Sequence, residues 1–118
     1  MKYMVLIYSN PATWADLPAE EADRVIGVHN DLIGELTDSG ELLGIHRLAH
    51  AGNARTVAQR DGVPVVTDGP FGGSEEVLAS LWEIDVESLK RAVEIAGILT
   101  PYATVEVRAL MDAAGMEM

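Results

Sequence analysis

The hydrophobic positions change their spacing along the chain, and each change predicts a different element. Residues 3–8 are nearly all apolar and rich in β-formers, which is typical of a strand buried on both faces. From residue 18 to residue 39 the apolar side chains recur at helical spacing, and Gly40 is the expected end of that helix. Residues 13–17, between this strand and this helix, are expected to form a loop that contains Trp14.

The middle of the chain alternates short apolar runs with turn residues. Residues 41–48 are expected to form a second strand. The runs 55–60 and 63–67 flank Asp61-Gly62, and Asp-Gly between two such runs is a strong signal for a β-hairpin. Residues 75–79 are expected to form a single helical turn.

The last third repeats the pattern of strand, helix and strand. Residues 81–86 have the composition of a strand, and Ser88 is placed to cap a helix over residues 89–99. Residues 104–110 alternate apolar and polar side chains, which predicts a half-buried strand. Residues 112–118 are expected to form a frayed tail.

The predicted order of elements is β-α-β, a β-hairpin insert, and β-α-β. Two split βαβ units of this kind indicate a ferredoxin-like α+β sandwich, here a single domain over residues 1–112 with a C-terminal tail at 113–118. Two helices can cover only one face of such a sheet, yet the strands are apolar on both sides. We therefore expect a homodimer in which a second subunit covers the other face.

Composition and charge narrow the range of functions. The 118 residues have a net charge of −11, with 8 basic against 19 acidic side chains, which argues against binding to nucleic acid or to an anionic membrane surface. There is no cysteine, so thiolate chemistry and disulfides are excluded, and a cytoplasmic location is expected. The apolar run at the N-terminus is too short for a signal peptide or a membrane span.

A glycine-rich stretch over residues 67–76 is the first place to search for a site. Its core, Asp68-Gly69-Pro70-Phe71, combines three turn-forming residues with one hydrophobic side chain. Loops carry binding and catalytic residues more often than helices or strands do. The stretch has neither a Walker nor a Rossmann fingerprint, so no phosphate site is indicated.

With these residues in view, the sequence resembles the YCII-related family, in particular its DGPF branch. The likeness extends over about residues 1–112. It is carried by Asp68-Gly69-Pro70-Phe71 with Glu76, and also by Met1-Lys2-Tyr3-Met4, Trp14, Glu35-Leu36, Gly40, Leu42, Leu43, Arg55-Thr56-Val57, Ile84-Asp85-Val86 and Val105-Glu106-Val107-Arg108.

The resemblance implies a ferredoxin-like fold that dimerises into an α/β barrel, as in muconolactone isomerase. It also implies a catalytic pair of His and Asp, which has been proposed for parts of the family. One relative in the family is a dehydrochlorinase. Some DGPF members are associated with extracytoplasmic-function sigma factors. The chain departs from the branch after Phe71, where the usual Ala-Glu-Thr-Lys-Glu is replaced by Gly72-Gly73-Ser74-Glu75-Glu76.

His29 and Asp68 are the candidate catalytic residues. His29 falls inside the apolar stripe of the first long helix, so it should face the sheet, where a half-buried imidazole can act as general acid or base. Asp68 would orient that imidazole. The alternatives are a core-edge histidine bonded to a backbone carbonyl and an aspartate that serves only an Asx-turn.

Six further residues are expected to line a substrate pocket: Tyr8, Trp14, His46, Pro70, Phe71 and Ser74. The family more often has Glu at the position of His46, so His46 is interpreted as lining the pocket. His46 and His50 do not have the spacing of a known metal motif, and neither a metal nor another cofactor is expected.

Two functions are compatible with the sequence. One is a lyase or isomerase-like enzyme that uses a His29–Asp68 acid–base pair on a small molecule, for example an aromatic one. The other is a non-enzymatic dimer that binds a small ligand or another protein beside a transcriptional regulator, without contacting DNA. The expected partners are a second copy of the chain and a small molecule, and no nucleic acid or membrane.

Overall fold

The computed structural model describes all of residues 1–118. Its elements follow one another as β1 (Lys2–Ser9), α1 (Pro11–Asp16), α2 (Ala19–Asp38), β2 (Leu42–Arg47), a short 3₁₀ helix η1 (Ala51–Asn53), β3 (Arg55–Arg60), β4 (Val63–Asp68), β5 (Val77–Asp85), α3 (Leu89–Ile98) and β6 (Thr104–Ala109). None of the helices is long and apolar enough to cross a membrane.

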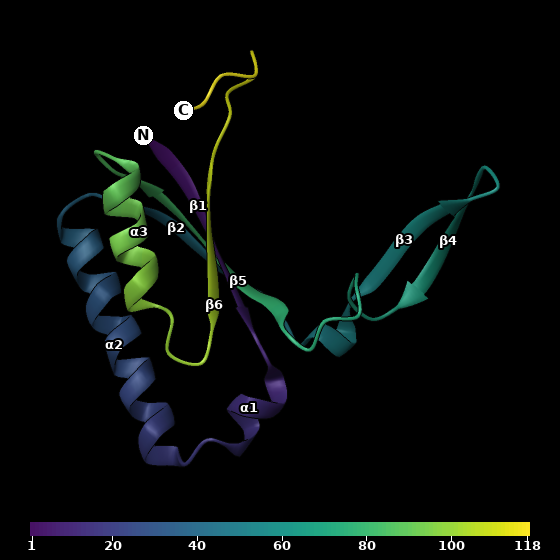
Figure 1. Cartoon of the computed structure of the whole chain (residues 1–118), viewed down its shortest axis with the longest axis horizontal. Coiled ribbons are helices and arrows are strands. Elements are labelled where there is room, and N and C mark those ends of the chain that lie inside the picture. Colours follow the sequence, from purple (N-terminus) through teal and green to yellow (C-terminus); the bar gives the residue numbers. More distant parts are fainter.

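Four strands form one antiparallel sheet, in the order β2-β5-β1-β6. The first strands of the two βαβ halves, β1 and β5, form its centre, which is the arrangement of a ferredoxin-like α+β fold. Helices α2 and α3 pack on one side of this sheet (Figure 1). The predicted α+β architecture is therefore confirmed.

The core lies between the sheet and these two helices. Along β1, every second side chain is buried, namely Tyr3, Val5 and Ile7. They pack with Trp82 and Ile84 of β5 and with the apolar faces of the helices, in a cluster that includes Leu36 and Ile95. All 13 buried residues are hydrophobic, so the core contains no buried charge that would need a partner.

The opposite face of the sheet, here called the open face, is not covered by any helix. It presents the other half of β1, Met4, Leu6 and Tyr8, each half-buried. Leu6 lies beside Leu81 of β5 and Glu106 of β6 in the strand register. The expectation that β1 is buried on both faces is thus met on only one face of the single chain.

Strands β3 and β4 form a separate two-stranded sheet, here called the arm. The two residues of its turn, Asp61 and Gly62, have φ values of 50° and 80°, the left-handed pair that a two-residue hairpin of this type requires. The predicted hairpin is confirmed. Figure 1 shows the arm projecting away from the rest of the molecule on the side opposite to the helices.

Three local predictions differ from the structure. Residues 11–16 form helix α1 rather than a loop, because the Asn10 side chain accepts a hydrogen bond from the amide of Ala12 at 2.9 Å and Pro11 occupies the first helical position. The predicted helical turn at 75–79 is wrong, since β5 begins at Val77, where it pairs with Ser9 of β1.

The third difference is at the C-terminus, where the predicted fray is replaced by a turn. The amide of Asp112 donates to the carbonyl of Met116 at 2.7 Å, and the carbonyl of Met118 accepts from the amide of Lys2 at 3.0 Å. The last residues therefore return to the start of β1.

The predicted cap of the second long helix is confirmed, because Ser88 accepts a hydrogen bond from the amide of Arg91 at 3.1 Å.

Candidate functional site

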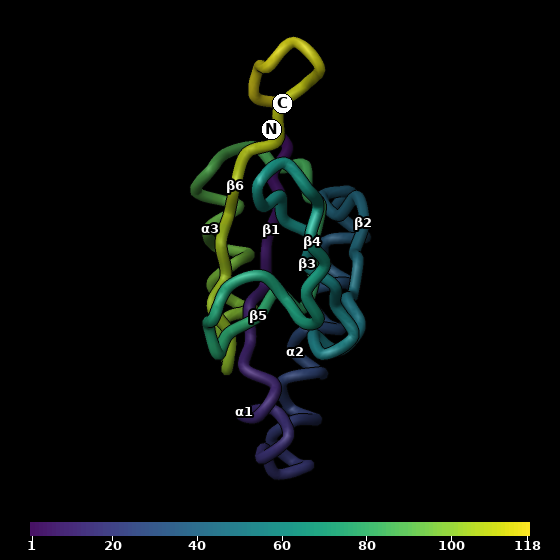
Figure 2. Tube along the Cα trace, turned by 90° about the vertical axis from the view of Figure 1, so that its right-hand side faces the viewer, coloured from purple at the N-terminus to yellow at the C-terminus, as the bar shows by residue number.

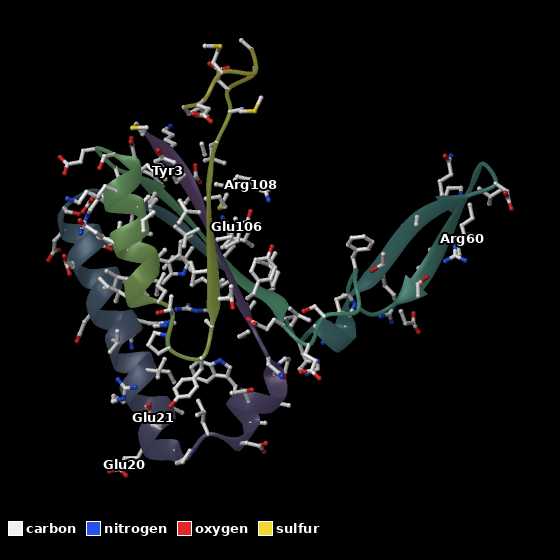
Figure 3. The ribbon with its side chains drawn as sticks, in the orientation of Figure 1. Tyr3, Glu20, Glu21, Arg60, Glu106 and Arg108 are labelled. Carbon is white, nitrogen blue, oxygen red and sulfur yellow. The ribbon has the colours of Figure 1, made fainter.

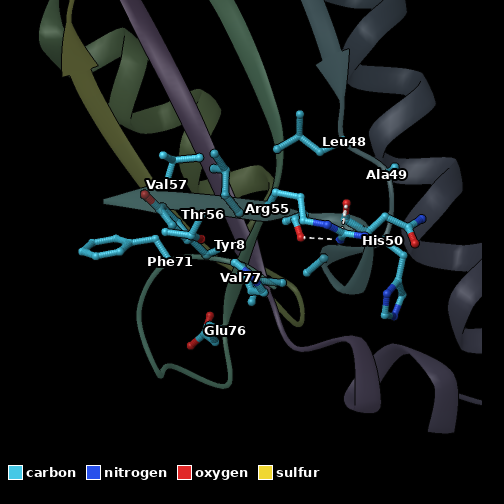
Figure 4. A pocket seen from close by; sticks show the side chains of 15 residues that line it. Tyr8, Leu48, Ala49, His50, Arg55, Thr56, Val57, Phe71, Glu76 and Val77 are labelled. Carbon is cyan, nitrogen blue, oxygen red and sulfur yellow. Dashed lines mark hydrogen bonds between the residues drawn. The ribbon is translucent and has the colours of Figure 1, made fainter. Parts of the chain in front are cut away.

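The main cavity lies where the base of the arm meets the ends of β1 and β5 (Figure 4). Its volume is about 800 Å³, and 9 of its 15 lining residues are hydrophobic. It is lined by Tyr8, Leu48, Ala49, His50, Ala51, Asn53, Ala54, Arg55, Thr56, Val57, Pro70, Phe71, Glu76, Val77 and Leu78. A mostly apolar cavity with a few polar groups is typical of a site for a small organic molecule.

Arg55 is the only cationic side chain that lines the cavity, and its position follows from the hairpin register. The two-residue turn at Asp61-Gly62 pairs Arg60 with Val63, and counting back along the strands places Arg55 opposite Asp68. The Arg55 Nε lies 3.1 Å from the Asp68 Oδ1. The Asp68 carboxylate therefore faces a guanidinium, and its negative charge offsets the positive charge at the cavity.

Backbone contacts hold the start of the Gly69-Pro70-Phe71 segment against the arm. The Thr56 hydroxyl donates to the carbonyl of Gly69 at 2.8 Å, and the amide of Gly69 donates to the carbonyl of Ala54 at 2.8 Å. Gly69 has a φ of 100°, a backbone conformation that residues with a Cβ rarely adopt. A glycine is thus required by the backbone at position 69, and it places Pro70 and Phe71 at the cavity.

Four further polar side chains line the cavity, those of Tyr8, His50, Asn53 and Glu76. The hydroxyls of Tyr3 and Tyr102 have partners within the chain, whereas the Tyr8 hydroxyl makes no such hydrogen bond. The His50 Nδ1 accepts from the amide of Gly52 at 3.0 Å, which assigns the ring proton of the neutral imidazole to Nε2. Glu76 accepts from the Thr104 hydroxyl at 3.1 Å. Figure 4 shows His50 at one end of the cavity, with Val57 and Phe71 at the other.

Of the six predicted pocket residues, the structure brings Tyr8, Pro70 and Phe71 together at this cavity. The other three lie elsewhere. Trp14 packs edge-on against Tyr102, with 6.3 Å between ring centroids. His46 lies on β2 beside Leu81, and the Ser74 hydroxyl accepts from the amide of Glu76 at 3.2 Å.

His29 lies on the sheet side of α2, as its place in the apolar stripe predicts. Its ring packs edge-on against Trp82 with 6.3 Å between centroids, and its Nε2 is buried without a hydrogen-bond partner. No hydrogen bond or ion pair joins His29 to Asp68, whose ionic partner is Arg55. Within one chain, the predicted pair is therefore not assembled.

The surroundings of His29 favour its neutral form. Burial lowers the pKa of His29 below its ordinary value of 6.5, and the positive charge of Arg47 lowers this pKa further. At a pH near 7 the imidazole is uncharged, which is the state that a general base requires. The structure contains no group of three or more His, Asp or Glu side chains arranged to hold a metal ion.

The lowered pKa of His29 makes stability depend on pH in a defined direction. The unfolded chain binds a proton at His29 more readily than the folded chain, so the free energy of unfolding decreases as the pH falls through and below 6.5. We expect His29→Gln to reduce this slope, measured by urea unfolding at several pH values from about 7.5 to 5. The natural chain is the reference, and an equal slope in the natural chain and in His29→Gln would contradict the assignment.

Twelve of the 15 cavity residues were not predicted from the sequence, among them Arg55, Thr56, His50 and Glu76. A usable signal existed for the first of these, because the Asp-Gly turn determines that residues 55 and 68 face each other. No comparable signal was present for His50, whose place depends on how the short η1 segment folds between β2 and the arm. The place of Glu76 in the cavity lining depends on the residue at which β5 begins.

A ferredoxin-like sheet with a hairpin arm and a mostly apolar cavity at its base defines a small α+β protein with a candidate ligand site. The sequence model of the YCII-related domain matches residues 1–112, and the chain belongs to this family. It is similar to an uncharacterized protein from Rhizobium meliloti (strain 1021), with 30% identity over 96 residues, which cover 81% of this chain and 77% of that protein.

Proposed function

We propose that this YCII-related protein is a homodimer of the DGPF branch that binds a small, largely apolar molecule at the base of the arm. The observation that carries the proposal is the cavity of about 800 Å³, which Pro70 and Phe71 line together with Tyr8 and Arg55. This volume lies within the range of small-molecule sites, and the lining combines apolar walls with a few polar groups that can fix an orientation.

The charges at the cavity narrow the class of ligand. The Arg55 guanidinium can bind an oxygen-rich group such as a carboxylate. Its charge is already offset by Asp68, and Glu76 adds a negative charge to the same lining. A ligand with several negative charges would be repelled by this balance and by the net charge of −11. The site therefore favours a neutral or singly charged molecule with an apolar, for example aromatic, body.

The homodimer is supported by the open face of the sheet. Met4, Leu6 and Leu81, each half-buried, lie near its centre beside Glu83, Glu106 and Arg108 in the strand register, and no helix of the chain covers them. Apolar side chains on an uncovered sheet face with a polar surround are typical of interaction surfaces. A second copy related by a two-fold axis would cover two such faces at once and would close the sheets into the dimeric α/β barrel that the family resemblance implies.

Removing the Tyr8 hydroxyl tests the cavity directly. We expect a panel of small aromatic carboxylates and their neutral amides to contain compounds that raise the melting temperature of the protein. Tyr8→Phe should weaken binding of these compounds by about tenfold, because it removes one unpartnered hydrogen-bonding group from the cavity. Tyr102→Phe, whose hydroxyl bonds Glu21 at 2.9 Å away from this cavity, is the matched control and should bind as the natural chain does.

Two results would contradict this proposal. One is a panel in which no compound shifts the melting temperature. The other is equal binding by the Tyr8→Phe variant and the natural chain for every compound that does bind.

A second candidate function rests on His29. Its buried, unpartnered Nε2 and lowered pKa give it the properties of a neutral general base, as a lyase or isomerase would use. In this function Asp68 would have to reach His29 from another subunit, because within one chain it pairs with Arg55. Ligand binding that is unchanged in His29→Gln, together with unchanged turnover of any compound the protein converts, would exclude His29 from the site.

A further inference from the structure

The arm is not supported by the rest of its own chain. A two-stranded hairpin is marginally stable in water unless a third strand or another layer packs on it. Here β3 and β4 pair only with each other, and three of their valines are largely exposed, Val57 and Val63 at 60% and Val66 at 62%. Phe71, at the base of the arm, is 92% exposed. Exposed apolar side chains on an isolated ribbon indicate that something else covers them.

The shape of the chain indicates how much surface is left to be covered. A compact domain of this length would have a radius of gyration of roughly 13.5 Å, whereas the value here is 16.4 Å. The accessible surface is 7708 Å², against roughly 6,200 Å² for a compact monomer of the same mass. The excess of about 1,500 Å² exceeds the roughly 800 Å² that each partner contributes to a stable interface.

The arm and the open face lie on the same side of the molecule. In Figure 1 the helices lie on one side of the sheet and the arm projects on the other. In Figure 2, seen from that other side, the arm stands in front of the sheet, with α2 and α3 behind it. A second copy that covers the open face would therefore lie beside the arm.

The charge distribution favours contact between the arm and an acidic partner such as a second copy. Residues 55–68 contain two arginines and two aspartates, so their net charge is zero, and the whole charge of −11 belongs to the rest of the chain. Two copies repel each other through that remainder, while the arm adds no repulsion. Arg60, at the far end of the arm in Figure 3, can meet acidic groups of a partner.

We propose that the arm of each subunit clasps a second copy stacked on the open face, and that this partner closes the cavity at the base of the arm. The inference rests on the proposed homodimer and adds to it that the binding site is incomplete in a single chain. It implies that ligand binding and dimerisation strengthen each other, because a ligand in the cavity contacts both subunits.

Hydrogen exchange of the arm amides tests the clasp in the natural protein. Amides of β3 and β4 in a lone hairpin should exchange almost as fast as in an unfolded peptide, because the hairpin opens easily. In concentrated protein we expect exchange slowed by about a hundredfold, and loss of this protection on dilution to the monomer. Arm amides that are unprotected in the concentrated protein, or whose protection survives dilution to the monomer, would overturn the inference.

A pair of valine substitutions identifies the arm as the contact. Val66→Lys should raise the dimer dissociation constant by about a hundredfold, since a two-fold interface contains the substitution twice. Val93→Lys is the control, because it makes the same substitution on α3, at a valine that is 55% exposed. It should leave the dimer dissociation constant unchanged. Both positions are exposed in the single chain, so both variants should fold, which circular dichroism would check.

The outcomes separate the clasp from the proposed function. If the aromatic compounds bind and the natural chain dimerises, but Val66→Lys has the dissociation constant of Val93→Lys, the clasp is wrong while the ligand site stands. If Val66→Lys weakens both the dimer and the binding of the same compounds, the partner completes the cavity as proposed.

Discussion

Replacing Trp82 by alanine is expected to lower the free energy of unfolding by about 3–5 kcal/mol, because it truncates the largest side chain of the core. Trp82 is 2% exposed at the centre of β5, between Val5 of β1 and Ile45 of β2 in the strand register. Truncation would leave a cavity that the rigid strands on both sides cannot fill. Because total stabilities are about 5–15 kcal/mol, the variant should lie close to the unfolding threshold at 37 °C.

The other tryptophan of the chain is the matched control. Trp14 lies on α1 at the surface, partly buried, and packs edge-on against the Tyr102 ring. Trp14→Ala should cost less, about 1–2 kcal/mol, because solvent can fill the space that the side chain leaves at the surface. Urea unfolding of both variants at one protein concentration measures the difference. Equal losses would show that the core does not lie between β5 and the helices.

Replacing Arg91 by methionine is expected to cost about 2 kcal/mol at pH 7. The Arg91 guanidinium makes two hydrogen bonds to Glu41, from Nε at 2.8 Å and from Nη2 at 3.0 Å. Both side chains are largely shielded, with 23% and 19% of their surface exposed. These bonds tie α3 to the chain just before β2, so their loss leaves a poorly solvated carboxylate without its partner. Lys90→Met, at an exposed neighbour on the same helix, should cost far less.

The same pair predicts a loss of stability in acid. The hydrogen bonds from Arg91, and next the one from Ser39, lower the pKa of Glu41 below its ordinary value of 4.5. A carboxylate with a lowered pKa stabilises the fold fully above pH 4.5, and this contribution is lost as the pH falls through the folded-state pKa. Glu41→Gln should be less stable at pH 7 and should lose less on acidification. An acid slope that does not change in this variant would show that the pair contributes nothing to the pH dependence.

The helix and strand positions were largely predictable because they follow from periodicity. The stripe that contains Val25, Leu32 and Leu36 predicted both α2 and the inward direction of His29, and both are confirmed. At α1, residues 13–17 were expected to form a loop. Asn10 and Pro11 are a helix cap and a first helical residue, but a short helix of six residues leaves no periodic signal that would indicate it.

The candidate site was less predictable because it depends on the direction of the arm. The Asp-Gly turn determines which residues of β3 and β4 face each other, including Arg55 and Asp68. It does not determine the direction of the arm relative to the sheet. Whether His29 and Asp68 can form a pair depends on that direction, so the pair could not be predicted from the turn. Pro70 and Phe71 line the cavity because they follow the arm in the chain and remain at its base, and their role as binding residues stays a prediction.

Trp14 and Ser74 were assigned to the pocket by residue type, and His46 by the residue that the family has at its position, in each case without a geometric signal. Trp14 belongs instead to a contact between α1 and Tyr102, a residue whose φ of 59° turns the chain before β6. His46 lies on an edge strand at the open face, where a second subunit would cover it. Its environment in the proposed dimer would therefore differ from that in one chain, and no pattern in a single chain describes that difference.

The most direct test of the proposed dimer is the mass of the unliganded protein in solution. A single chain has a mass of 12.7 kDa, an arm without support and an apolar sheet face without cover. Sedimentation equilibrium at micromolar concentration should give twice 12.7 kDa, with dissociation only on strong dilution. A mass of 12.7 kDa throughout that range would contradict the dimer, and with it the closure of the cavity by a second copy.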